Sequence, residues 1–154
     1  MTLVIIEPDK TQKIIKLKSY NMPNYSSILI PEDWEYEVDY DNQHEQIFFP
    51  SDSDLTVRVN VFSITKDNQA VPKERIIEIA RNIPDNMTET DMIEINLPDY
   101  HTTTYYREYM EDNKLVYHIL VKVIRDGKMC TYNSYCTDKN QCIFGAWFIN
   151  YLEL

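Results

Sequence analysis

Glycine and cysteine are both scarce in this chain of 154 residues, and each scarcity excludes a class of site. The two glycines, Gly127 and Gly145, stand far apart, whereas phosphate-binding loops of the P-loop and dinucleotide types need several glycines close together. The cysteines are an odd set, Cys130, Cys136 and Cys142, without a Cys-x-x-Cys pair. Such a set fits neither a disulfide framework nor a zinc site, and it suits a reducing cytoplasm.

Positive charge and long apolar runs are also limited. Lysine and arginine number 15 against 25 acidic residues, which gives a net charge of −10. Nucleic acids and anionic membranes need a cationic protein surface, so neither is an expected partner. The apolar run at residues 3–6 is too short for a signal peptide, and no other run reaches the length of a membrane span. We therefore expect a cytoplasmic protein.

The residue patterns of common catalytic and metal centres are missing as well. His44, His101 and His118 are scattered without a His-x-x-x-His pair, and there is no Gly-x-Ser-x-Gly elbow. Any carboxylate pair chosen from 25 acids would carry no information. We expect a non-enzymatic protein without a metal or cofactor. The remaining alternative is an enzyme of a class that these motifs do not mark.

Alternation of apolar and polar residues is the clearest pattern that is present, and it predicts β-strands with one buried face. It is strictest at Leu55, Val57, Val59 and Val61. The predicted strands cover residues 2–6, 12–18, 26–30, 34–39, 45–49, 55–64, 92–97, 100–111, 114–125 and 128–136. Two-residue turns, Asp112-Asn113 and Asp126-Gly127, join the last three of them, and Asp-Gly is a strong hairpin signal.

Two segments change to helical spacing. Apolar residues recur over residues 72–83 as an amphipathic helix would require, and again from residue 138 to about residue 149, before a short final strand. The prediction is a single α+β domain over residues 1–154, with an N-terminal hairpin at 1–20 and a core at 21–154. In it, an antiparallel sheet of about six or more strands carries the amphipathic helix and the C-terminal helix.

The order of these parts resembles the PsbP-like fold superfamily, which includes the Ran-binding import factor Mog and many small bacterial proteins. The resemblance starts at Ile28-Leu29-Ile30-Pro31-Glu32-Asp33-Trp34, where such proteins place a short strand, a proline and a turn ending in tryptophan. It continues through residues 55–64, 72–83, 100–111 and 114–135, and covers residues 26–154. It implies a small bacterial branch with a binding or accessory role and no shared catalytic machinery, and it transfers no functional residue.

Acidic residues crowd the segment at residues 32–45. On a strand that starts at Trp34, alternation places four of them on one face: Glu35, Glu37, Asp39 and Asp41. Like charges in a row destabilise a sheet, so this row is either a well-solvated face or a surface for a basic partner. The overall negative charge favours binding without deciding between the two.

A second candidate surface follows from the register of the last three strands. With two-residue turns, Arg107 lies opposite His118, and His118 lies opposite Tyr135, with Tyr105 close by. Arginine and tyrosine together are typical of binding hot spots. The alternative is a polar row that is half-covered by the final helix. In either case we expect Arg107 to keep the imidazole of His118 neutral.

The opposite face of the same strands is predicted to be core. It gathers Leu115, Tyr117, Ile119, Val121, Val123, Tyr106, Met110, Cys130, Tyr132 and Cys136. We expect Ile119 and Val121 to lie beneath the helix at 72–83 or the final segment.

Two hypotheses of function follow. The leading one is a small bacterial-type interaction module that binds a basic protein through the acidic row or the tyrosine-rich surface. An immunity protein that neutralises a toxin is one concrete form. The alternative is a small-ligand-binding module with a pocket between the sheet and the C-terminal helix, lined by Arg107, His118, Tyr135 and Tyr105. In that pocket, arginine would neutralise an anionic ligand and the tyrosines would supply apolar walls and hydroxyls.

Overall fold

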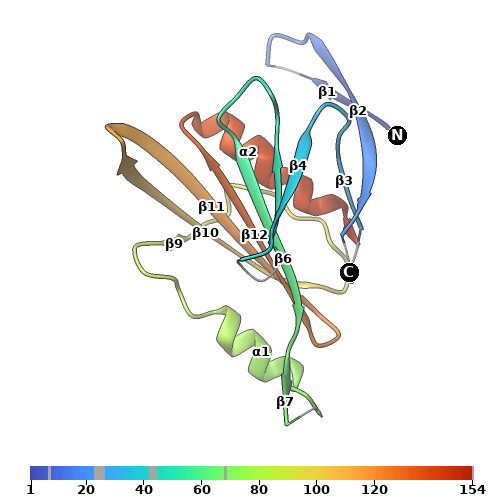
Figure 1. Ribbon diagram of the computed structural model, residues 1–154, viewed down its shortest axis with the longest axis vertical. Coiled ribbons are helices and arrows are strands. Elements are labelled where there is room, and N and C mark those ends of the chain that lie inside the picture. Colours follow the sequence, from blue (N-terminus) through green and yellow to red (C-terminus); the bar gives the residue numbers. More distant parts are fainter. Residues whose placement is uncertain (7, 23–26, 42–44, 68, 154) are drawn as a thin grey trace.

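The computed structural model describes residues 1–6, 8–22, 27–41, 45–67 and 69–153. Two antiparallel sheets, one of seven strands and one of four, pack around a C-terminal helix, and a shorter helix lies toward the other end of the molecule (Figure 1). The predicted α+β class, with helices packed on an antiparallel sheet, is confirmed.

The larger sheet is built mainly from the strands that the alternating pattern predicts. Its strands lie in the order β4-β5-β6-β12-β11-β10-β9. Their bounds are β4 Glu35–Asp39, β5 Glu45–Phe49, β6 Thr56–Ser63, β9 Thr88–Glu89, β10 His101–Glu111, β11 Lys114–Arg125 and β12 Lys128–Cys136. All neighbouring pairs are antiparallel, so cross-strand partners point to the same face of the sheet.

The N-terminal hairpin belongs to the smaller sheet. Its strands lie in the order β1-β2-β3-β13, with bounds β1 Thr2–Ile6, β2 Gln12–Asn21, β3 Ser27–Pro31 and β13 Leu152–Glu153. The short last strand was expected from the sequence and is confirmed. A separate two-stranded hairpin consists of β7 (Thr65–Lys66) and β8 (Gln69–Ala70).

The C-terminal segment forms α2 (Lys139–Trp147) and continues into the 3₁₀ turn η1 (Phe148–Tyr151). Asp138 fixes the start of α2, because its side chain accepts a hydrogen bond from the backbone N–H of Gln141 at 2.9 Å. Among the described residues, no helix is long and apolar enough to span a membrane.

The first helix, α1 (Lys73–Ala80), is shorter than the predicted 72–83. It follows Pro72, whose fixed φ suits a helix start. Ile76 is fully buried, whereas Ile79 is 39% exposed and Ile83 is 57% exposed. The predicted apolar stripe is therefore only partly buried.

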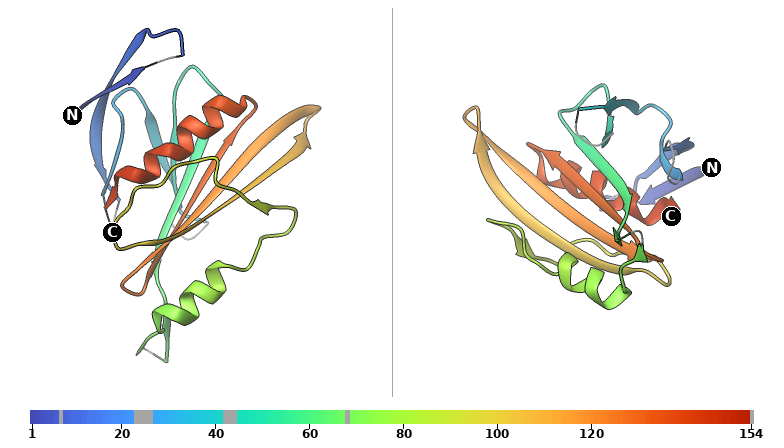
Figure 2. Two further views of the ribbon diagram at one scale, coloured as in Figure 1. Left: turned by 180° about the vertical axis from the view of Figure 1, so that it is seen from behind. Right: turned by 60° about the horizontal axis from the view of Figure 1, so that its bottom comes forward.

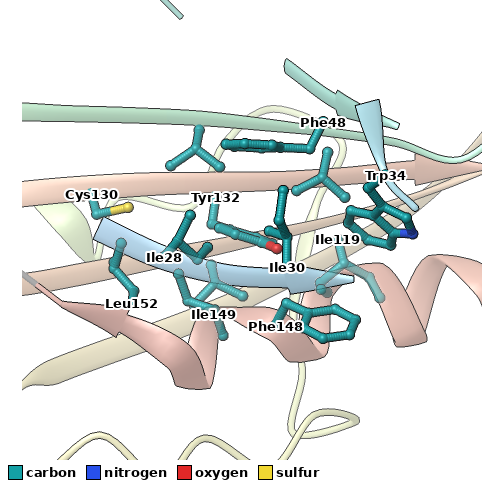
Figure 3. Packing of buried hydrophobic residues seen from close by; sticks show 14 of the residues in the cluster. Ile28, Ile30, Trp34, Phe48, Ile119, Cys130, Tyr132, Phe148, Ile149 and Leu152 are labelled. Carbon is teal, nitrogen blue, oxygen red and sulfur yellow. The ribbon is translucent and has the colours of Figure 1, made fainter. Parts of the chain in front are cut away.

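The main core lies between α2, the smaller sheet and one face of the larger sheet (Figure 3). Ser134 and Tyr132 of β12 donate hydrogen bonds to the carbonyl oxygens of Cys142 and Gly145 in α2, at 2.8 and 3.0 Å. Both side chains are fully buried. This face of the larger sheet is therefore the one that α2 covers.

Most of the predicted core residues are buried, Tyr106 and Tyr117 are partly buried against the main core, and two residues at the tip of the β10–β11 hairpin are exposed. Ile119 and Val121 are fully buried within the main cluster, as predicted. Met110 is 65% exposed and Leu115 is 39% exposed. The prediction that these two belong to the core is wrong, because this hairpin extends beyond α2 (Figure 1).

The strand predicted at residues 92–97 is absent, and these residues form no regular element. The segment runs beside α2 (Figure 2), and Ile93 is buried in the main core. Two backbone groups of this segment bond to the side chain of Asn150, which accepts from the N–H of Asn96 at 2.7 Å and donates to the carbonyl of Glu94 at 3.1 Å. An asparagine after α2 thus takes the place of a partner strand.

Candidate functional site

The face of the larger sheet opposite α2, which we call the open face, carries both groups of candidate residues. Asn133 and Tyr135 point to it, because they alternate with the helix-facing Tyr132 and Ser134. One line of cross-strand partners crosses the sheet from β4 to β11 and consists of Glu37, Ile47, Arg58, Asn133 and Leu120. The acidic strand and the Arg-His-Tyr row, alternatives in the sequence, are thus two parts of one surface.

Part of the open face is covered by the segment between β8 and β10. Ile76 of α1 packs against Ile124, so that α1 and α2 lie on opposite faces of the larger sheet (Figure 2). Met87 packs against Tyr105 and Leu120. Tyr105 is only 1% exposed as a result, which corrects its predicted place in a surface hot spot.

The predicted row of Arg107, His118 and Tyr135 is present. Arg107 and His118 are direct cross-strand partners, and so are His118 and Tyr135. Both turns are two-residue loops with positive φ at each position: 49° and 61° at Asp112-Asn113, and 49° and 74° at Asp126-Gly127. These are the backbone angles that a right-twisted hairpin needs, and asparagine, aspartate and glycine adopt them readily.

His118 is the centre of this row and is only 5% exposed. Its Nδ1 accepts a hydrogen bond from Nε of Arg107 at 2.8 Å, so Nε2 carries the proton and donates to Oδ1 of Asn133 at 2.7 Å. The Tyr135 ring stacks on the imidazole with centroids 4.1 Å apart. Burial, and to a smaller extent Arg107, lowers the pKa of His118 to about 4. The predicted neutral imidazole is confirmed, with burial as its main cause.

The prediction that the final helix half-covers this row is wrong, and the row does not line a space against that helix. The reason is the alternation on β12: Ser134 faces α2, so its neighbour Tyr135 faces away. The row is covered instead by contacts among its own side chains and Tyr109. The Arg107 guanidinium stands 4.4 Å from the centroid of the Tyr109 ring, so that cation and ring stack.

The predicted acidic row is present on β4 for Glu35, Glu37 and Asp39, whereas the placement of Asp41 on the same strand is wrong. Glu35, Glu37 and Asp39 are paired with every second residue of β5 and share the open face. Glu35 and Glu37 are exposed and Asp39 is half-buried. Asp41 lies beyond the strand, and its backbone N–H donates to Oδ1 of Asp39 at 3.2 Å. Within the described part of the chain, none of these four acids forms an ion pair.

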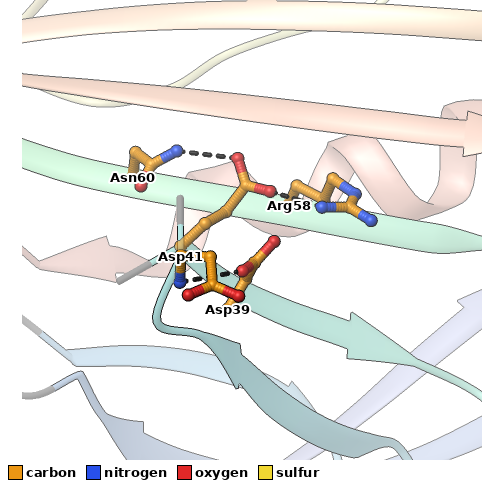
Figure 4. A network of polar contacts seen from close by, with 5 residues as sticks. Asp39, Asp41, Arg58 and Asn60 are labelled. Carbon is orange, nitrogen blue, oxygen red and sulfur yellow. Dashed lines mark hydrogen bonds and ion pairs between the residues drawn. The ribbon is translucent and has the colours of Figure 1, made fainter. Parts of the chain in front are cut away.

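Glu45 ends the acidic segment at residues 32–45 and is only 6% exposed. Its two carboxylate oxygens accept from Nη1 of Arg58 at 2.6 Å and from Nδ2 of Asn60 at 2.7 Å, both on β6 (Figure 4). Arg58 and Asn60 stand two residues apart on a strand, hence on one face, which is the signal that could have revealed this network. Glu45 therefore anchors β5 to β6.

A shallow pocket of about 470 Å³ hollows the open face beside the Arg-His-Tyr row. Tyr109, Tyr135, Arg58 and Lys114 are among its lining residues. Burial raises the pKa of both Tyr109 and Tyr135, so both keep a neutral hydroxyl that can donate a hydrogen bond. Chemically, the pocket offers aromatic surface, hydroxyls and charges of both signs, because Asp54, Glu111 and Asp112 line it as well.

A larger pocket of about 720 Å³ borders α2. It is lined by Lys13, Ile14, Ile15, Lys16, Pro31, Glu32, Asp33, Trp34, Pro50, Asp52, Ser53, Leu55, Asn140, Gln141 and Phe144. A pocket therefore does adjoin the C-terminal helix, but it shares no residue with the predicted set of Arg107, His118, Tyr135 and Tyr105.

The cysteines are not arranged for nucleophilic or metal chemistry. Cys130, Cys136 and Cys142 are all buried and unpaired. Burial raises the pKa of the Cys136 and Cys142 thiols to about 11 each, and raises that of Cys130 as well. Among the described residues, no group of three or more histidine, cysteine or acidic side chains could hold a metal ion.

Comparison with known proteins supports the fold. No family model matches the sequence, and no curated protein is significantly similar to it. A solved structure from Bacteroides thetaiotaomicron VPI-5482 is similar with a TM-score of 0.63 at 15% identity; the match covers 88% of this chain but 47% of that one, so this chain spans about half its length. LpqN of Mycobacterium tuberculosis, involved in cell envelope biogenesis, is similar with a TM-score of 0.59 at 13% identity over 88% of each chain. Such identities show a shared fold alone.

Proposed function

We propose that this protein is a non-enzymatic module that binds a basic segment of another protein on its open face. The observation that carries this proposal is that the acidic strand β4 and the Arg107–His118–Tyr135 row share one face of one sheet. Carboxylates at one end would steer a basic partner, and ordered tyrosine and arginine side chains at the other would supply contact area.

The position of β4 supports binding of an extended segment. Among the described residues, β4 is the edge strand of the larger sheet, so one side of its backbone is paired with no other described strand of that sheet. A partner segment added there would place every second side chain on the same face as Glu35 and Glu37. Lysine or arginine at those positions would meet carboxylates that form no ion pair with any described residue.

The tyrosine end of the open face supports a preorganised contact surface. Tyr135 is held by stacking on His118, and Arg107 is held by its hydrogen bond to the same imidazole. Side chains fixed before binding lose little conformational entropy when a partner docks, which favours affinity. The pocket of about 470 Å³ beside them would receive one side chain of the partner.

Within this proposal, an immunity-type protein that neutralises a basic toxin is one concrete form. A cytoplasmic location is supported by the three cysteines, which are all free. The order of strands and helices supports membership of a small bacterial branch of the PsbP-like superfamily.

The test is affinity isolation with charge-reversed variants. The double variant Glu35→Lys/Glu37→Lys reverses the two exposed acids of β4 and leaves Asp39, which accepts a hydrogen bond, unchanged. The matched control Glu74→Lys/Glu94→Lys makes the same change in net charge at exposed positions outside β4. We expect basic proteins captured by the wild type and the control to be lost with the β4 variant.

Two further results complete this test. Replacing Tyr135 with alanine should weaken the same partner, since it removes the other part of the surface. Thermal melts of all variants establish that each is folded. Identical partners for the wild type and the β4 variant would contradict the proposed acidic surface.

A further inference from the structure

The floor of the larger pocket, beside α2, is formed by apolar side chains. Ile15, Trp34 and Leu55 line it and are 8%, 4% and 2% exposed, and Phe144 of α2 adds a fourth apolar side chain. Its volume of about 720 Å³ lies in the range of roughly 300–1,000 Å³ that is typical of small-molecule sites. Concave apolar surface with a few polar groups around it is the usual form of such a site.

Charges of both signs surround this floor. The cations are Lys13 and Lys16 on β2, and the anions are Glu32 and Asp33 in the β3–β4 turn and Asp52 in the loop after β5. Nζ of Lys13 lies 5.6 Å from the centroid of the Phe144 ring, directly over the apolar surface. Within the described ranges of the chain, none of these five residues forms an ion pair.

The two lysines on β2 and Asp52 in the loop after β5 lie on different walls of the pocket. The β1–β2 hairpin and the loop after β5 both rise above α2, with the β3–β4 turn close to them (Figures 1 and 2). Lys13 comes from the first wall and Asp52 from the second. A ligand that pairs with both Lys13 and Asp52 must therefore carry a negative and a positive group on one apolar body.

We propose that this pocket binds a short hydrophobic peptide with free termini. Its carboxylate would lie toward Lys13 and Lys16, its ammonium group toward Asp52, and its apolar side chains on Trp34 and the other floor residues. A molecule with one charged head would leave one wall without a counter-charge. This site lies on the α2 side of the larger sheet, so it is independent of the partner surface on the open face.

The experiment uses the dipeptide Phe-Leu and three blocked analogues. N-acetylation removes the positive end, C-terminal amidation removes the negative end, and both together leave a neutral peptide of similar size. Binding is followed by the NMR chemical shifts of the backbone amide and tryptophan indole N–H groups in ¹⁵N-labelled full-length protein. We expect the zwitterion to bind tightest and each blocked end to weaken binding by about twofold to fivefold, as for exposed charge pairs.

Two single variants and a control connect this effect to named residues. Lys13→Gln should reduce the preference for a free carboxylate over an amide, because only Lys16 then remains, and Asp52→Asn should remove the preference for a free amine. Lys10→Gln, an exposed change of the same charge outside the pocket, should leave both preferences intact. Equal binding of all four peptides would overturn the proposal. So would an absence of shift changes at Trp34 and Leu55 up to the solubility limit of Phe-Leu.

Discussion

Acid should destabilise this protein through His118. Burial, followed by Arg107, lowers the pKa of His118 from 6.5 to about 4 in the folded chain. Between these two values the unfolded state binds more protons than the folded state, so the free energy of unfolding falls as the pH falls. At about 1.4 kcal/mol per pKa unit, the contribution is about 3 kcal/mol. It is fully present above pH 6.5 and lost by about pH 4.

The assay compares the wild type with His118→Gln in urea unfolding at a series of pH values. Glutamine keeps hydrogen-bonding groups next to Arg107 and Asn133 but does not titrate. Because the carboxylates titrate in both proteins, their effect cancels in the difference between the two unfolding free energies. We expect that difference to fall by about 3 kcal/mol between pH 7 and pH 4. A difference that does not change with pH, or an NMR titration of His118 near pH 6.5, would refute this reasoning.

Two further predictions concern packing. Gly145→Ala would gain about 1 kcal/mol of helix propensity, but its Cβ would lie 2.8 Å from both Leu55 Cδ1 and Ser134 Oγ, and overpacking costs about 1–3 kcal/mol. We expect a net loss of stability in urea unfolding; a more stable variant would show that the neighbours can move. We also expect iodoacetamide to modify none of the three buried cysteines in the folded protein and all three in urea, as followed by mass spectrometry. A thiol that reacts quickly in the folded state would contradict the burial described above.

The β10–β12 meander could be predicted from sequence because its signals are local. Alternation defines each strand, and a two-residue turn then fixes which residues are partners. The same pattern failed at residues 92–97, where Ile93 is buried although no strand forms. Alternation shows which side chains face the core, but it does not show where the backbone finds its hydrogen bonds. Here they go to Asn150, which is distant in the chain.

The face that α2 covers could not be predicted for a different physical reason. Both faces of β11 carry apolar residues: Ile119 and Val121 on one, Leu120 and Ile124 on the other, and all four are buried. Each face therefore needs a cover, and the sequence supplies two helices. Their assignment depends on long-range packing, with Ile76 of α1 on one face and α2 on the other. The register of the candidate row was thus accessible from sequence, whereas its cover was not.

The acidic segment shows how burial divides residues of the same charge into different roles. Glu45 places its carboxylate in the sheet, and a buried carboxylate is tolerated only where charged and hydrogen-bonding partners satisfy both oxygens. Arg58 and Asn60 do so. Glu35 and Glu37 have no such partners among the described residues and remain exposed. Reversing the charge of Glu45 would therefore test folding. Reversing the charges of Glu35 and Glu37 tests binding, so only that double variant can report on a basic partner.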